Sequence, residues 1–252
     1  YQSNPSETAC VACQPGRNAS YDTQCVDCTT GLYQAAEAAA TCDICGPGKY
    51  SSMRAETCTD CPSGKSQKKP SSADCADCSP GTYQMLTGQT QCIACMEGKA
   101  NPLPRQTSNE SCSNCAPGQY QDRQGADQCT GCVQGTASSA EGLTVPCPKC
   151  QPGRYQSKQG FTDCRDCARG TDVAEHGVMK ASACTLCTPE EACEGGGECA
   201  RGYTSVIDDG AAFCSFCERG YFKMRYKCHK CPAASGWISV LAACIFIGFA
   251  FL

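Results

Sequence analysis

The sequence predicts an array of small disulfide-rich repeats, elongated into a rod with little regular secondary structure and followed by one C-terminal transmembrane helix. Three observations support this fold class. Cysteine supplies 29 of the 252 residues, a density typical of disulfide scaffolds. Most of these cysteines form Cys-x-x-Cys (CxxC) pairs that recur at a short period. The chain also ends in an uncharged apolar stretch.

Apolar residues before that stretch are too few for a conventional core. Val, Ile, Leu and Phe make up only 19 of the first 236 residues, about 8%, and a chain below roughly 20% is normally disordered. Disulfides can compensate, because closing a loop of about 15 residues removes roughly 3 kcal/mol of unfolded-chain entropy. Such bonds persist only in an oxidising compartment, so we expect the repeats to be extracellular.

The repeat is marked by glycine as well as by cysteine. Thirteen CxxC pairs occur, and in the first ten a Gly lies three residues after the second Cys. Glycine at a fixed place usually marks a turn with positive φ, so we expect short two-stranded ribbons beside it, stabilised by the disulfides. Alternate pairs add a Tyr two residues later, which we expect to cover a disulfide, and this alternation indicates a unit of about 35 residues. These tyrosines are Tyr50, Tyr83, Tyr120 and Tyr155.

The sequence leaves the disulfide pairing open. Four cysteines allow three pairings, and a bond within one CxxC would be strained. We favour bonds from first to third and from second to fourth Cys, because the spacing is more constant inside a unit than between units. A competing ladder joins the second Cys of each pair to the first Cys of the next, such as Cys28 to Cys42. The favoured bonds are Cys42–Cys58, Cys45–Cys61, Cys75–Cys92, Cys78–Cys95, Cys112–Cys129, Cys115–Cys132, Cys147–Cys164 and Cys150–Cys167.

The full pattern, C-x2-C-x2-G-x-Y followed by a second C-x2-C-x2-G, resembles the ephrin-receptor-like cysteine-rich repeat. It is also similar to tumour-necrosis-factor-receptor (TNF-receptor) and EGF-like modules. The resemblance covers about residues 10–170. It implies a rod of EGF/TNF-receptor-like modules, which act as spacers in many large surface proteins.

The repeat spacing predicts the domain organisation. After Cys187 the rhythm breaks, and we interpret the following segment as an EGF-like cap whose eight cysteines, from Cys184 to Cys231, can pair among themselves. The expected ranges are 1–9 for a truncated N-terminal linker, 10–41, 42–74, 75–111, 112–146 and 147–183 for five modules, 184–232 for the membrane-proximal cap and 233–252 for the transmembrane helix.

The C-terminal stretch has the length of a membrane span. Sixteen residues from Trp237 to Leu252 carry no charge, and extension back to Ala233 gives twenty, enough for a helix of about 30 Å. We expect residues 233–252 to cross the bilayer, with Trp237, Lys227 and Lys230 at the membrane interface. A glycosylphosphatidylinositol attachment signal is the alternative, but it requires a polar spacer that the sequence lacks.

Few other residues indicate chemistry. Asn18 and Asn109 begin Asn-x-Ser sequons, so N-linked glycans are possible. Zinc ribbons separate their CxxC pairs by about 15–20 residues, whereas here the separation is mostly 12–13. Only two His residues occur, which leaves few candidates for acid–base catalysis. The net charge of −4 lacks the basic signature of nucleic-acid binding.

These patterns predict a non-enzymatic protein without a cofactor. We expect an extracellular stalk or anchor that tethers a larger surface ectodomain, filament or complex to the membrane through protein partners. The alternative is a cell-surface receptor that binds a protein ligand through its repeats. The expected location is the plasma membrane or a ciliary or flagellar surface, with the repeats outside the cell.

Overall fold

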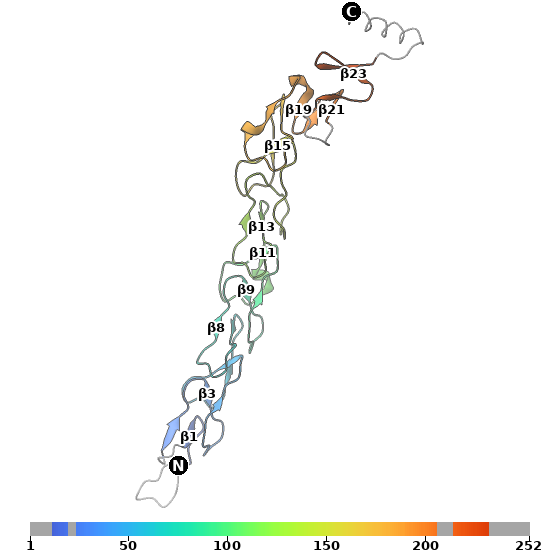
Figure 1. Ribbon diagram of the computed structural model, residues 1–252. Coiled ribbons are helices and arrows are strands. Elements are labelled where there is room, and N and C mark those ends of the chain that lie inside the picture. The colour runs from blue at the N-terminus through green and yellow to red at the C-terminus, as the bar shows by residue number, and fades with distance from the viewer. Residues whose placement is uncertain (1–11, 20–23, 206–213, 232–252) are drawn as a thin grey trace, which may run out of the picture. The chain divides into compact units, whose positions relative to one another are not determined.

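The structure is a computed structural model that describes residues 12–19, 24–205 and 214–231 (Figure 1). Within these ranges the regular structure consists of short strands and three 3-10 helices of three residues each. The strands form twelve separate antiparallel sheets of two strands each. Small disulfide-rich repeats with little helix, as the sequence predicts, are therefore confirmed.

The chain divides into two compact units. The first comprises Tyr1–Cys132, Ser138–Cys147 and Gly160–Thr162. Its labelled strands follow one another in sequence order from β1 to β13 (Figure 1). Its elements are β1 (Arg17–Ala19), β2 (Cys25–Asp27), β3 (Leu32–Tyr33), β4 (Asp43–Ile44), β5 (Lys49–Tyr50), β6 (Thr59–Asp60), β7 (Lys65–Ser66), β8 (Ala76–Asp77), β9 (Thr82–Tyr83), β10 (Ile93–Ala94), β11 (Lys99–Ala100), η1 (Asn109–Ser111), β12 (Ser113–Asn114), β13 (Gln119–Tyr120) and β14 (Thr130–Gly131).

The second unit comprises Val133–Ala137, Pro148–Gln159 and Asp163–Leu252. It continues the same hairpins and ends in longer strands. Its elements are β15 (Arg154–Tyr155), β16 (Arg165–Asp166), β17 (Thr171–Asp172), η2 (Ala181–Ala183), β18 (Thr185–Leu186), η3 (Glu190–Ala192), β19 (Cys193–Gly195), β20 (Glu198–Cys199), β21 (Tyr203–Thr204), β22 (Phe216–Cys217), β23 (Tyr221–Met224) and β24 (Lys227–Lys230).

Each module is a hairpin of about 17 residues closed by one disulfide. In a representative module, β7 follows the turn at Gly64 and pairs with β8, which is the interior of the next CxxC. Cys61 and Cys75 are bonded across this hairpin. The N–H of Cys78 donates to the carbonyl of Gly64 at 2.9 Å and closes the ring. The repeat that the structure shows is thus half the length of the predicted unit; the predicted domain ranges remain a prediction.

The disulfides follow the ladder, so the favoured pairing is wrong. Because the two central residues of a CxxC form the second strand of one hairpin, its first Cys closes that hairpin and its second Cys opens the next. Cys78 accordingly bonds Cys92 rather than Cys95. The regular bonds are Cys13–Cys25, Cys28–Cys42, Cys45–Cys58, Cys61–Cys75, Cys78–Cys92, Cys95–Cys112, Cys115–Cys129, Cys132–Cys147, Cys150–Cys164 and Cys167–Cys184.

The ladder register also corrects the expectation for the cap. Cys184 bonds Cys167 outside the predicted cap, so the eight cysteines do not pair only among themselves. The remaining bonds are Cys187–Cys193, Cys199–Cys214 and Cys217–Cys228. Cys231, the second Cys of the last CxxC pair, is free and exposed.

Backbone hydrogen bonds hold each module to the next. The N–H of Gly48 donates to the carbonyl of Gln67 one module on, at 2.7 Å. In turn, the N–H of Gln67 donates to Gln89 at 3.1 Å, and the N–H of Gly88 donates to Cys61 at 2.8 Å. Gly88 also lies close to Gly48, two modules earlier in the chain. A Cβ built on Gly48 would lie 2.1 Å from the carbonyl oxygen of Gly88. Only glycine, at φ +79°, permits this approach.

Candidate functional site

The residue two positions after a module glycine lies in the first strand of its hairpin, except for Ala137, which follows an isolated bridge at Thr136. We call it the contact position, because its side chain reaches the disulfide of the following module where contacts are resolved. In the sequence this place holds Tyr in some modules and a smaller residue in others. The ten contact positions are Asn18, Tyr33, Tyr50, Ser66, Tyr83, Ala100, Tyr120, Ala137, Tyr155 and Asp172.

Polar side chains at the contact position lie against a sulfur atom. The Oγ of Ser66 lies 3.4 Å from the Sγ of Cys92. Because Cys92 is in a disulfide, the hydroxyl is the group that donates. The Oδ1 of Asn18 lies 3.5 Å from the Sγ of Cys42. In both cases the disulfide belongs to the next module along the chain.

Where the contact position is tyrosine, as at Tyr83, the ring covers the disulfide of the following module. Tyr83 is 8% exposed and packs against the buried Cys95 and Cys112, which are bonded to each other. The expectation that these tyrosines cover a disulfide is therefore confirmed for Tyr83. Ala100 and Ala137 bury a small side chain at the equivalent place. Packing between modules is thus centred on sulfur rather than on aliphatic groups.

A glutamine directly after the contact position forms two hydrogen bonds with the backbone of the loop in its own module. The Nε2 of Gln84 donates to the carbonyl of Gln91 at 2.8 Å, and its Oε1 accepts the N–H of Leu86 at 3.0 Å. The sequence places a Gln directly after Tyr83, Tyr120 and Tyr155, but the sequence alone does not show what it bonds. Its fixed position in the repeat could have indicated a structural role, because an amide side chain can both donate and accept hydrogen bonds. The same pair of bonds is made by Gln34, Gln67, Gln121 and Gln156.

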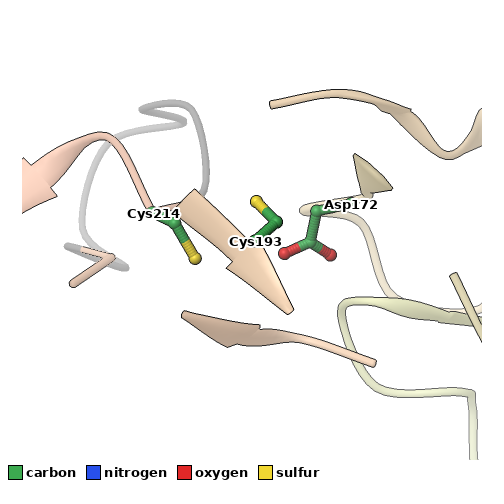
Figure 2. A group of neighbouring side chains, drawn as sticks. All are labelled: Asp172, Cys193 and Cys214. Atoms are coloured by element: carbon green, nitrogen blue, oxygen red, sulfur yellow. The ribbon is translucent and has the colours of Figure 1, made fainter. Parts of the chain in front are cut away.

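Asp172 is the one acidic residue at a contact position, and it is 3% exposed. Its Oδ1 accepts the N–H of Val173 at 2.7 Å, whereas its buried Oδ2 has no hydrogen-bond partner among the described residues. A carboxylate oxygen of Asp172 and the sulfurs of Cys193 and Cys214 all lie within 4.8 Å of one another (Figure 2). Burial raises the pKa of Asp172, and the hydrogen bond from Val173 partly opposes this shift.

The three groups in Figure 2 have the ligand types of a metal site but not its chemistry. Cys193 is bonded to Cys187 and Cys214 to Cys199. Neither sulfur is therefore a thiolate, which is the form of cysteine that binds metal ions. The arrangement is that of a buried acid packed against two disulfides.

The two predicted glycosylation sites differ in their surroundings. Asn18 is half-buried, and its Nδ2 donates to the carbonyl of Ala40 at 3.2 Å. Asn109 begins the helix η1 and is exposed. Glycosylation itself stays a prediction at both sites.

The structure describes two of the three residues that were predicted to lie at the membrane interface. Trp237 and the span 233–252 lie outside the described residues, and within those residues no helix is long and apolar enough to cross a membrane. Lys227 and Lys230 lie on β24 and are exposed. Lys227 forms an ion pair with Glu191, and the hydrogen bond to this carboxylate raises the pKa of Lys227.

Comparison with known proteins adds no relative. No protein-family model matches the chain, and no curated protein matches it.

Proposed function

We propose that the chain is a non-enzymatic extracellular stalk or anchor that tethers a larger surface ectodomain, filament or complex to the membrane. The observation that carries this proposal is the uniformity of the contact between modules. In every case the N–H of the module glycine donates to a carbonyl of the next module. The pairs are Gly16 to Gln34, Gly31 to Ser51, Gly48 to Gln67, Gly64 to Gln84, Gly81 to Asn101, Gly98 to Gln121, Gly118 to Ser138, Gly135 to Gln156 and Gly153 to Val173.

Uniform contacts suit a spacer better than a recognition site. In a linear repeat protein each repeat contacts only its near neighbours, so stability and length grow repeat by repeat. Within the described residues, thirteen disulfides close the repeats and the C-terminal segment. That number indicates an extracellular or secreted protein. The resemblance to ephrin-receptor-like and TNF-receptor-like repeats, which act as spacers in surface proteins, also supports the proposal.

The anchor is the second part of the proposal. The apolar run that begins at Trp237 would cross the bilayer. The disulfide array would then stand outside the cell, on a plasma membrane or a ciliary or flagellar surface. Protein partners would bind upstream of the membrane, and glycans would coat the modules.

Deletion of whole modules tests the stalk. Removing residues 78–114 or residues 45–77 takes out two complete ladder steps and leaves the remaining bonds in register. The height of an N-terminal fluorescent tag above the membrane, measured by energy transfer to a lipid dye, should fall by a similar amount for both deletions. Any loss in tethering of the surface partner should depend only on how many residues are deleted, and not on which modules are removed.

The receptor alternative predicts a different outcome. Exposed apolar residues are more numerous in 78–114 than in 45–77, which holds Met53. Those in 78–114 are Met85, Leu86, Ile93, Met96 and Leu103. If deletion of 78–114 abolishes partner binding while deletion of 45–77 preserves it, the repeats recognise a ligand and the stalk proposal fails.

A further inference from the structure

The last hairpin of the described chain differs from every other hairpin in its length. Strands β23 and β24 pair over four residues each, whereas the other strands have two or three residues. Side chains alternate across a strand, so Phe222 and Met224 share one face. Phe222 is 43% exposed, Met224 54% and Tyr226, at the turn, 71%. The ring of Phe222 lies beside the exposed ring of His229, with centroids 5.9 Å apart.

The same hairpin concentrates positive charge. Residues 218–230 hold five Lys or Arg and one Glu, a net charge of +4, although the whole chain carries −4. The remaining residues therefore carry −8. Lys227 is paired with Glu191. The side chains of Arg225 and Lys230, by contrast, form no ion pair and no hydrogen bond with any residue that the structure describes.

We propose that this hairpin lies on the surface of an anionic lipid bilayer. Phe222, Met224 and Tyr226 enter the headgroup region. Arg225 at the turn binds lipid phosphates, as does Lys230, which lies opposite Tyr221 on the other face of the hairpin and reaches the phosphates with its long side chain. Exposed aromatic side chains combined with Lys and Arg are typical of segments that lie in the membrane interface. The long Lys and Arg side chains let the apolar residues sit deeper than the charges. This inference rests on the proposed membrane anchor.

Two observations favour a bilayer over an acidic protein as the occupant. Only six residues separate Lys230 from Trp237, where the apolar run begins, so the hairpin stays within about 25 Å of any bilayer that the run enters. The rest of the chain, at −8, is repelled by an anionic surface. The hairpin is therefore the part of the described chain that such a surface attracts.

Lysine footprinting on the full chain tests the proposal. The chain is reconstituted in nanodiscs of zwitterionic or of partly anionic lipid and treated with a water-soluble acylating reagent, and labelled lysines are counted by mass spectrometry. In anionic discs we expect labelling of Lys223 and Lys230 to fall by about three-fold or more and to recover at about 0.5 M salt. Labelling of the exposed Lys68 and Lys69 should stay constant.

Matched charge reversals identify the contact. The double variant Lys223→Glu and Arg225→Glu should abolish the protection of Lys230. The control, Lys68→Glu with Lys69→Glu, makes the same change in net charge and should leave that protection intact.

The remaining outcomes each overturn the inference in a different way. Equal labelling of hairpin and control lysines in anionic discs would contradict the contact between hairpin and lipid but would leave the proposed membrane anchor unaffected. Protection that appears in detergent and rises with protein concentration assigns the hairpin to a protein partner instead. A chain that does not co-migrate with the discs overturns the anchor itself, and this inference with it.

Discussion

The carboxylate of Asp172 and the sulfur of Cys193 lie within 4.8 Å of each other, buried where the regular repeat gives way to the C-terminal segment. At the equivalent place Ser66 offers a hydroxyl to the sulfur of Cys92. A protonated Asp172 can donate in the same way, whereas an ionised one adds a buried charge beside an electron-rich sulfur. Which form is present therefore decides how well this junction packs.

We predict that the junction is more stable in acid. Burial raises the pKa of Asp172 above its ordinary value of 3.8. A group with a raised folded-state pKa contributes stability that is complete below the unfolded value and is lost as the pH rises through the folded value. Hydrogen exchange of backbone amides in β17 and β19 should therefore accelerate from about pH 4 upward, relative to the intrinsic rate.

The variant Asp172→Asn isolates this effect. Its amide keeps a donor and cannot ionise, so the pH dependence should vanish and the neutral-pH stability should rise by about 1 kcal/mol, within the cost of an unsatisfied buried group. Asp172→Ala should also remove the pH dependence, since Ala100 and Ala137 occupy the same place. A wild-type profile that matches Asp172→Asn at every pH would show that the carboxyl titrates normally.

The loop glutamines give a second prediction, based on burial. Gln156 is fully buried and Gln67 is half-buried, yet both make the same two hydrogen bonds. Gln156→Ala removes two hydrogen bonds made by a fully buried amide and should cost about 2 kcal/mol. Gln67→Ala removes the same two bonds from a half-buried amide, which water can replace, and should cost about half as much. Amide exchange at Lys158 and Lys69, whose N–H groups donate to Gln156 and Gln67, measures both effects against wild type. Equal losses would mean that burial does not govern the contribution of these bonds.

The sequence predicted the parts of a module better than their connection. The glycine turns are confirmed, since Gly48 has φ +79°, and so are the two-stranded ribbons and the cover that Tyr83 gives to a disulfide. The pairing failed because loops of 12–13 residues inside a unit and 13–16 between units differ too little to show which Cys closes which hairpin. That choice depends on the strand formed by the two central CxxC residues, which short polar dipeptides do not reveal.

The environment of Asp172 could not have been predicted from spacing. The alignment of repeats shows Asp172 in the place of Tyr or Ala, but its neighbours Cys193 and Cys214 follow the point where the rhythm breaks. Only the folded C-terminal segment brings both disulfides beside it.

A module glycine and a loop glycine give a third prediction, which separates steric contact from backbone strain. Gly48 and Gly160 both have positive φ, +79° and +74°. A Cβ on Gly48 would lie 2.1 Å from the carbonyl oxygen of Gly88, whereas a Cβ on Gly160 would meet nothing within 4 Å. Gly160→Ala should therefore cost only the left-handed strain, about 1–2 kcal/mol. Gly48→Ala should cost more and should loosen the hydrogen bond from Gly88 to Cys61.

Protection of the Gly88 amide against hydrogen exchange provides the measurement. We expect it to fall in Gly48→Ala and to be unchanged in Gly160→Ala. Comparable protection in both variants would show that the modules can separate at this point without loss.

The two sequons give the last prediction, because a glycan needs room around its asparagine. Nδ2 is the atom that carries an N-linked glycan; in Asn18 it donates to Ala40, and Oδ1 of the same side chain lies against Cys42 in the next module. Asn109 is exposed. When the chain is expressed in a secretory host, we expect Asn109 to be occupied and Asn18 to be largely bare in the folded, disulfide-bonded fraction. Enzymatic deglycosylation in heavy-oxygen water followed by peptide mass spectrometry reads both sites. Full occupancy of Asn18 in protein that retains the Cys28–Cys42 bond would contradict the packing of this module.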